Sequence, residues 1–223
     1  MQTPNVKSTF DSISFEWDKN ESNIENIYNF CTIFLNLTDP HNKISTRILE
    51  HTMRTIKIAE KIMTKEIADR EIVIISLLMH DIGKTLCDTD HNLISYRIAE
   101  LLFNKFDVLP TKKKKILDAI LYHSAKNLST LDISDELKVI MDADIIDEVG
   151  LLLIAKICLR VSNKNISISS LLSTLDNKYQ KVNKETDLLK TKYGKELYCQ
   201  RKKKLKEDIE RLKIESIEYK IKK

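Results

Sequence analysis

Residues 77–84 read LLMHDIGK, an apolar run that ends abruptly in an adjacent histidine and aspartate. Because the run begins near Ile72, it brings an imidazole and a carboxylate to the buried end of an apolar segment. A buried carboxylate is costly unless it is paired or binds a metal ion. The pair His80-Asp81 therefore indicates a site, although a helix that ends in a hydrogen-bonded histidine and a surface aspartate would explain it equally well.

The composition predicts an all-α protein. Three glycines and three prolines in 223 residues supply few tight turns, whereas Lys, Glu and Leu, which favour helices, are frequent. The length suits one domain. We expect residues 1–223 to form this domain, with a core over about 45–160, an N-terminal arm and helix over 1–44, and a charged helical extension over 161–223.

Apolar residues recur at helical spacing along most of the chain. We expect helices at about 22–37, 45–63, 69–83, 167–191 and 194–220, and others that begin at His91, Pro110 and Ser134. Residues 1–20 show no clear period and predict a loosely structured arm. The segment 151–161 is strongly apolar and is expected to be buried, and the last two helices are expected to hinge near Gly194.

Composition also bears on location and partners. No segment approaches ~20 uncharged apolar residues, so no membrane span is expected. The N-terminus lacks the order of a signal peptide. The four cysteines form no Cys-x-x-Cys pair, which favours reduced thiols in a cytoplasm over a zinc finger.

The charge is unevenly distributed. The net charge is +4, but residues 190–223 hold 13 basic and six acidic residues, which is +7 and leaves −3 for the rest. Such a segment can bind nucleic acid. A solvated helix face is the commoner explanation, and we favour it.

Two further polar side chains fall on the apolar faces of expected helices. His51 and Asp144 face inward by their spacing, whereas Asp142 is expected to point away. Together with His80 and Asp81 they make two imidazoles and two carboxylates. This mixed ligand set leaves coordination positions open and suits Mn²⁺, Fe²⁺, Co²⁺ or Mg²⁺ better than a closed zinc site.

Other polar residues extend this candidate site. His91 and His123 lie on the apolar sides of their helices, where they could complete a second metal site or contact a phosphate. Lys84 and Arg54 carry the charge needed to hold phosphate oxygens. His41 falls in a predicted turn and is expected to be exposed.

The order His, His-Asp, Asp resembles the HD-domain superfamily of metal-dependent phosphohydrolases. The resemblance lies in residues 50–54 (EHTMR), 78–84 (LMHDIGK) and 142–150 (DADIIDEVG). It implies an all-α helical bundle that cleaves a phosphoester or phosphoanhydride bond with the help of a bound metal ion.

The resemblance also implies a ligand set. His51, His80, Asp81 and Asp144 match the metal ligands of the family, with Asp142 as the fallback for the last one. The ion would be Mn²⁺, Fe²⁺, Co²⁺, Ni²⁺ or Mg²⁺, and a second ion is an open alternative.

We expect three residues to act in catalysis, namely Asp81, Lys84 and His123. Asp81 would double as the base that orients the attacking water. Arg54, Lys84, His91 and His123 would bind the substrate and stabilise charge on its phosphoryl oxygens.

The stretch 142–150 and the tail, with Tyr179, residues 191–195 and Arg201, also resemble the small stand-alone bacterial HD proteins, some of which are nucleotide pyrophosphohydrolases. This implies a small-molecule phosphate substrate, either a nucleoside triphosphate or a cyclic or bridged dinucleotide. Three alternatives stay open. The chain could be a nuclease or phosphodiesterase with a polynucleotide on its basic tail, or a nucleotide-binding module without turnover, and its last two helices could form a homodimer.

Overall fold

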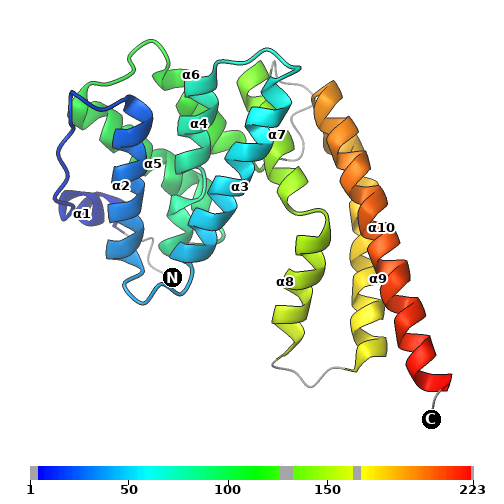
Figure 1. Ribbon diagram of the computed structural model, residues 1–223. Helices are drawn as coiled ribbons and strands as arrows, with labels where there is room; N and C mark the ends of the chain where they lie inside the picture. Colours follow the sequence, from blue (N-terminus) through cyan, green and yellow to red (C-terminus); the bar gives the residue numbers. More distant parts are fainter. Residues whose placement is uncertain (1–4, 126–132, 163–166, 222–223) are drawn as a thin grey trace. The chain divides into compact units, whose positions relative to one another are not determined.

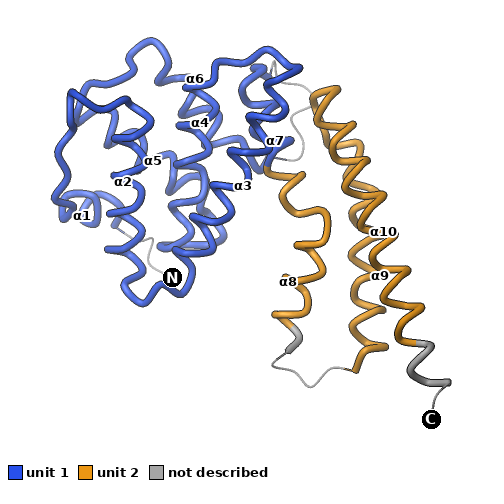
Figure 2. Tube along the Cα trace, viewed as in Figure 1, with its two compact units in different colours: residues 1–143 blue, residues 144–223 orange. Residues whose placement is uncertain are grey.

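The computed structural model describes residues 5–125, 133–162 and 167–221, and the regular elements in these ranges are all helical (Figure 1). The predicted all-α class is therefore confirmed. The chain forms two compact units, residues 1–143 and 144–223 (Figure 2), and a single domain over 1–223 stays a prediction. Within the described ranges, none of the helices has the length and apolar character needed to cross a bilayer.

The first unit is a cluster of helices. It contains α1 (Val6–Asp11), α2 (Asn23–Thr38), α3 (Ser45–Met63), α4 (Arg70–Met79), the 3₁₀ turn η1 (Ile82–Thr85), α5 (His91–Phe106), α6 (Lys113–Tyr122) and most of α7 (Asp135–Asp147). The predicted arm over residues 1–20 includes the short helix α1. This helix forms because Asn5 caps it and because Phe10 packs on Phe30, with ring centroids 5.8 Å apart.

Helix α4 is the centre of this unit. Its residues from Ile72 to Met79 are all buried, and it packs against α2, α3 and α6. Asp69 caps it by accepting hydrogen bonds from the backbone N–H groups of residues 71 and 72. The helix ends at Met79, so the predicted end at Gly83 is wrong: the chain changes to the 3₁₀ turn η1.

A close backbone approach explains this turn. A Cβ atom on Gly83 would lie 2.5 Å from the carbonyl oxygen of His91 and 2.9 Å from the amide nitrogen of Ser95. The amide of Gly83 donates a hydrogen bond to the hydroxyl of Ser95 over 2.9 Å. Glycine thus lets η1 lie directly against the first turns of α5.

The predicted helix at Pro110 begins later and has a different first turn. Lys112 precedes α6 and pairs with Asp69 and Glu71, each at 2.8 Å. These carboxylates raise the pKa of Lys112. The ion pairs tie the start of α6 to the start of α4.

The second unit consists of the end of α7 and the helices α8 (Leu151–Ser162), α9 (Ile168–Glu185) and α10 (Lys192–Ile221), with a 3₁₀ turn η2 (Thr186–Leu188) before α10. The predicted hinge at Gly194 is wrong, because Gly194 lies inside α10 and the break falls at η2. Helix α8 is less buried than predicted, since Leu151 and Leu159 are 67% and 74% exposed.

Replacing Gly83 with alanine should destabilise the protein. The added methyl group would overlap the backbone of α5, and overpacking of this kind costs about 1–3 kcal/mol. Urea denaturation should show a lower free energy of unfolding. Ser95→Ala is the control, because it removes the hydrogen bond to Gly83 without adding volume. Its free energy of unfolding should fall by less than that of Gly83→Ala. Equal stability of Gly83→Ala and the wild type would contradict the close approach.

Candidate metal centre

Four of the predicted histidines lie at one place in the first unit, and helix ends position three of them. His80 and His123 directly follow α4 and α6, and His91 is the first residue of α5. His51 comes from the middle of α3. His41, the fifth histidine of the chain, is exposed in the loop before α3, as predicted.

Backbone carbonyls fix the tautomers of the two buried histidines. The Nδ1 atom of His80 is 2.7 Å from the carbonyl oxygen of Leu77, and Nδ1 of His123 is 2.8 Å from that of Ile120. A carbonyl can only accept, so each Nδ1–H donates. In the neutral ring, Nε2 then carries a lone pair that is directed away from the helix end.

Asp81 lies between two pairs of histidines. Its Oδ2 atom is 3.5 Å from Nε2 of His80 and 3.7 Å from Nε2 of His51. Its Oδ1 atom is 3.5 Å from Nε2 of His91 and 3.8 Å from Nε2 of His123. The Nε2 atoms within the two pairs are 3.3 Å and 3.4 Å apart. Each pair forms, with Asp81, a group that could hold a metal ion.

The donor atoms fit such an ion. Nδ1 of His91 donates to the carbonyl oxygen of Asp88 at 2.9 Å, so both Nε2 atoms of the His91–His123 pair are acceptors when the rings are neutral. Oδ1 of Asp81 is buried, and no hydrogen-bond partner for it exists among the described residues. Three converging acceptors repel one another unless a cation joins them. Two ligands about 2.1 Å from one ion lie about 3–3.5 Å apart, which matches the observed spacing.

Lys84 also contacts the central carboxylate. Its ammonium group forms an ion pair with Oδ2 of Asp81, and its side chain is about one-third exposed. Burial would raise the pKa of Asp81, but the adjacent His80, Lys84 and His123 outweigh it and keep the pKa well below its usual range. Asp81 is therefore an anion at neutral pH, as a metal ligand must be.

The predicted ligands from α7 differ from expectation in their burial. Asp142 is fully buried, so the expectation that it points away from the core is wrong, whereas Asp144 is partly exposed. The spacing argument failed because α7 is buried on more than one side. Asp144 lies in the second unit and Asp142 in the first, and which of them is a ligand stays a prediction.

Arg54 is on α3, one turn after His51. Its guanidinium lies 4.0 Å from the carboxylate of Glu50 and is partly exposed. Its predicted contact with a substrate phosphate stays a prediction.

Comparison with known proteins identifies the domain. Residues 48–148 match the family model of the HD domain. The chain carries an HD domain. This range includes four of the histidines, Asp81 and both candidate aspartates of α7, and it confirms the family that the motifs predicted. No curated protein sequence matches the chain.

Solved structures share the fold. The crystal structure of a predicted HD superfamily hydrolase from an uncultured Thermotogales bacterium is 22% identical, with a TM-score of 0.56, and the match covers 86% of this chain and 90% of that one. YpgQ from Bacillus subtilis is 20% identical, with a TM-score of 0.63 over 86% and 94% of the two chains. Lin1889 from Listeria innocua is 21% identical, with a TM-score of 0.59 over 86% and 96%.

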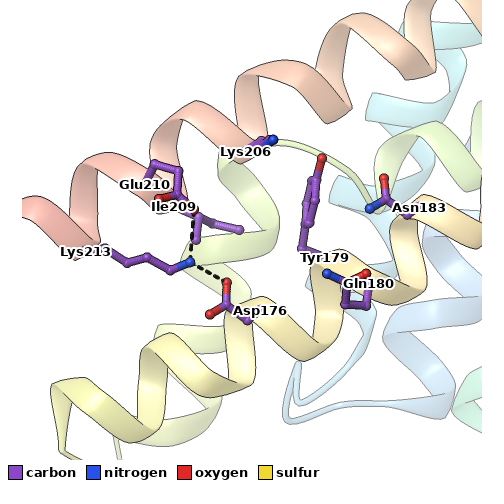
Figure 3. A pocket seen from close by; sticks show the side chains of 8 residues that line it. All are labelled: Asp176, Tyr179, Gln180, Asn183, Lys206, Ile209, Glu210 and Lys213. Atoms are coloured by element: carbon purple, nitrogen blue, oxygen red, sulfur yellow. Dashed lines mark hydrogen bonds and ion pairs between the residues drawn. The ribbon is translucent and has the colours of Figure 1, made fainter.

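A separate cleft of about 480 Å³ lies between α9 and α10 in the second unit (Figure 3). It contains Tyr179, which the tail resemblance singled out. Its central ammonium, Lys213, is already paired with Asp176 at 2.9 Å and with Glu210 at 3.0 Å. The cleft therefore resembles the ion-paired seam of a helical hairpin.

Metal binding should weaken in acid. Ligand imidazoles must be neutral, and burial lowers the pKa of His91 below its ordinary 6.5. We expect the affinity for Mn²⁺ to be constant from pH 8 to about 6.5 and to fall below it. Since the unfolded chain binds the proton of His91 more readily, the free energy of unfolding should also fall below about pH 6.5.

Isothermal titration calorimetry at pH 7.5, 6.5 and 5.5 measures this affinity. His41→Ala removes an exposed histidine and should show the same pH profile as the wild type. Equal affinity for Mn²⁺ at pH 5.5 and 7.5 would contradict histidine ligation.

Proposed function

We propose that this HD-domain chain is a metal-dependent phosphohydrolase that cleaves a phosphoester or phosphoanhydride bond of a nucleotide. One observation supports this most strongly. A single buried carboxylate, Asp81, offers one oxygen to each of two histidine pairs. Such a mixed nitrogen and oxygen set with few protein ligands leaves room for water and substrate.

These distances support His51, His80 and Asp81 as ligands of a first divalent ion, and His91 and His123, again with Asp81, as ligands of a second. Asp144 of α7 would complete the first set, as the resemblance to the HD-domain superfamily implies. A bound divalent ion supplies Lewis-acid activation of the phosphoryl group and of water. Mn²⁺, Fe²⁺, Co²⁺, Ni²⁺ and Mg²⁺ are all compatible with this donor set.

Side chains would activate the attacking water and stabilise the charge on the phosphoryl group. Asp81, held ionised, can orient an attacking water and accept its proton. Lys84 is close to Asp81 and partly open to solvent, so its ammonium can turn to the phosphoryl oxygens as charge develops on them. Arg54 would bind a more distant phosphate. If the second ion is absent, His91 and His123 would contact the phosphoryl oxygens themselves.

A nucleotide is favoured over a polynucleotide. Several basic groups of the tail are engaged within the second unit: Arg201 binds the carbonyl of Ile146, and Lys202 binds the hydroxyl of Thr186, both at 2.9 Å. Engaged cations are poorly suited to track a phosphate backbone. The four free cysteines agree with a reducing cytoplasm as the place of reaction. A homodimer stays part of the proposal.

Hydrolysis of a nucleotide panel by the Mn²⁺-loaded protein is the direct test. We expect turnover by the wild type and a loss of at least about 100-fold in Asp81→Asn, because this variant lacks the carboxylate that serves as both ligand and base. Asp11→Asn, on the exposed side of α1, is the control. Resolved products distinguish pyrophosphate release from monoester or diester cleavage.

The outcomes are distinct. Metal-loaded wild type that hydrolyses no member of the panel would contradict the nucleotide substrate. Tight nucleotide binding without any turnover would support the non-catalytic module instead.

Lys84→Met should lower kcat by about 10²-fold or more and leave the affinity for Mn²⁺ nearly unchanged, because the ammonium stabilises charge that develops during the reaction. Steady-state kinetics together with calorimetry measure the two quantities. Lys114→Met, an exposed lysine of α6, is the matched control. A Lys84→Met variant with normal kcat would show that this lysine only neutralises Asp81.

A further inference from the structure

The two histidines assigned to the second ion come from different helices. His91 is the first residue of α5, and His123 directly follows α6. In each ring, Nδ1 donates to the carbonyl oxygen of the residue three positions earlier in the chain. These local bonds orient each imidazole on its own helix. They do not determine how far apart the two imidazoles lie.

The side chain next to His91 links the two helices. Nδ2 of Asn92 donates a hydrogen bond to the carbonyl oxygen of Leu121 over 2.8 Å, across 29 positions of sequence. Leu121 lies in the last turn of α6, two residues before His123. The last carbonyl groups of a helix have no partner within it, so Leu121 can accept this bond. The bond therefore joins the neighbourhood of one histidine to that of the other.

Apolar packing alone would restrain the two helices less sharply. Helices α5 and α6 pack against each other, and both bury an apolar face, which includes Ile98 of α5 and Ile116 of α6. Burial of apolar surface is non-directional. A hydrogen bond, in contrast, needs a donor–acceptor distance of about 2.7–3.2 Å and a nearly linear arrangement. The bond from Asn92 therefore limits sliding and rotation of the start of α5 against the end of α6.

The spacing of the two imidazoles needs such a restraint. Nε2 of His91 and Nε2 of His123 are 3.4 Å apart, and both are acceptors when the rings are neutral. Two lone pairs at this distance repel each other until a cation joins them. The bond from Asn92 opposes their separation. A site that is already held in its binding arrangement loses less conformational freedom on binding, which raises its affinity.

We propose that Asn92 is a positioning residue for the second metal ion: through the carbonyl of Leu121 it holds His91 and His123 at the spacing that one ion can bridge. The inference rests on the proposed function, in which these histidines and Asp81 bind a second ion. Partners that orient metal ligands typically change metal affinity or activity by about 10–100-fold when they are removed.

The role concerns one of the two ions. The hydrogen bond of Asn92 connects α5 with α6, whereas His51 lies on α3 and His80 follows α4. Loss of this bond should therefore weaken binding of the ion held by His91 and His123, and leave binding of the other ion nearly unchanged. A general loosening of the first unit would weaken the binding of both ions.

The test is a calorimetric titration of the full chain with Mn²⁺ at pH 7.5. We expect two binding steps in the wild type, and His91→Ala identifies the step that belongs to the second ion. Asn92→Ala should weaken this step by about 10-fold and leave the other step nearly unchanged. Alanine favours a helix more than asparagine does, so the substitution does not weaken α5 itself.

Asn104→Ala is the matched control. Asn104 also lies on α5, and it accepts a hydrogen bond from Lys113 at the start of α6. This bond joins the same two helices, but at about 1.5 Å per residue it lies about 18 Å from Asn92 along α5. Asn104→Ala should bind both ions like the wild type.

Two further variants test the hydrogen bond itself. Asn92→Gln keeps an amide donor on a longer side chain and should recover part of the affinity for the second ion. If Asn92→Ala does not fold, Asn92→Ser replaces it, because the shorter side chain of serine cannot span the distance to the carbonyl of Leu121. It should show the same selective loss.

The results separate this inference from the proposed function. If Asn92→Ala binds both ions like the wild type, weakens both steps equally or behaves like Asn104→Ala, the positioning role is overturned and the phosphohydrolase proposal stands. If the wild type binds only one ion, the inference fails and the phosphohydrolase proposal stands on the first ion. If the wild type binds no Mn²⁺, the metal assignment fails and the inference fails with it.

Discussion

The desolvation of one carboxylate governs the first unit. Asp81 is 2% exposed, yet its neighbours keep it ionised at neutral pH. A buried anion without compensation is strongly unfavourable, so the surrounding elements must present positive or metal-binding groups to it. The 3₁₀ turn after α4, the glycine against α5 and the histidines at three helix ends all serve this one requirement. The site is therefore a consequence of how the helices end, more than of how they pack.

Much of the fold could be predicted because its signals are local. Ser22 forms a capping box with Glu25 at the start of α2, and Ser134 caps α7 as expected. Predictions failed where contacts between residues far apart in the sequence determine the structure. The end of α4 depends on the approach of α5 to Gly83, and the burial of Asp142 depends on what packs around α7. Neither contact has a signature within the segment itself.

The site was predictable in its members but not in its arrangement. Spacing placed His51, His91 and His123 on inward faces, and the structure brings all three to Asp81. That one carboxylate would serve both histidine pairs depends on the relative placement of α3, α5 and α6, which periodicity cannot give.

The same kind of hydrogen bond, from a side chain to a backbone carbonyl, occurs at the ends of three helices. The carbonyls of Leu77, Ile120 and Ile146, in the last turns of α4, α6 and α7, accept hydrogen bonds from His80, His123 and Arg201. In each case a carbonyl in the last turn of a helix, where the helix itself supplies few donors, binds a polar or charged side chain. For the histidines the bond selects the tautomer in which Nε2 carries the lone pair that can bind a metal. For Arg201 the bond joins α10 to the end of α7 within the second unit. For His80 and His123, a hydrogen bond that satisfies a backbone carbonyl therefore also prepares the donor atom of the centre.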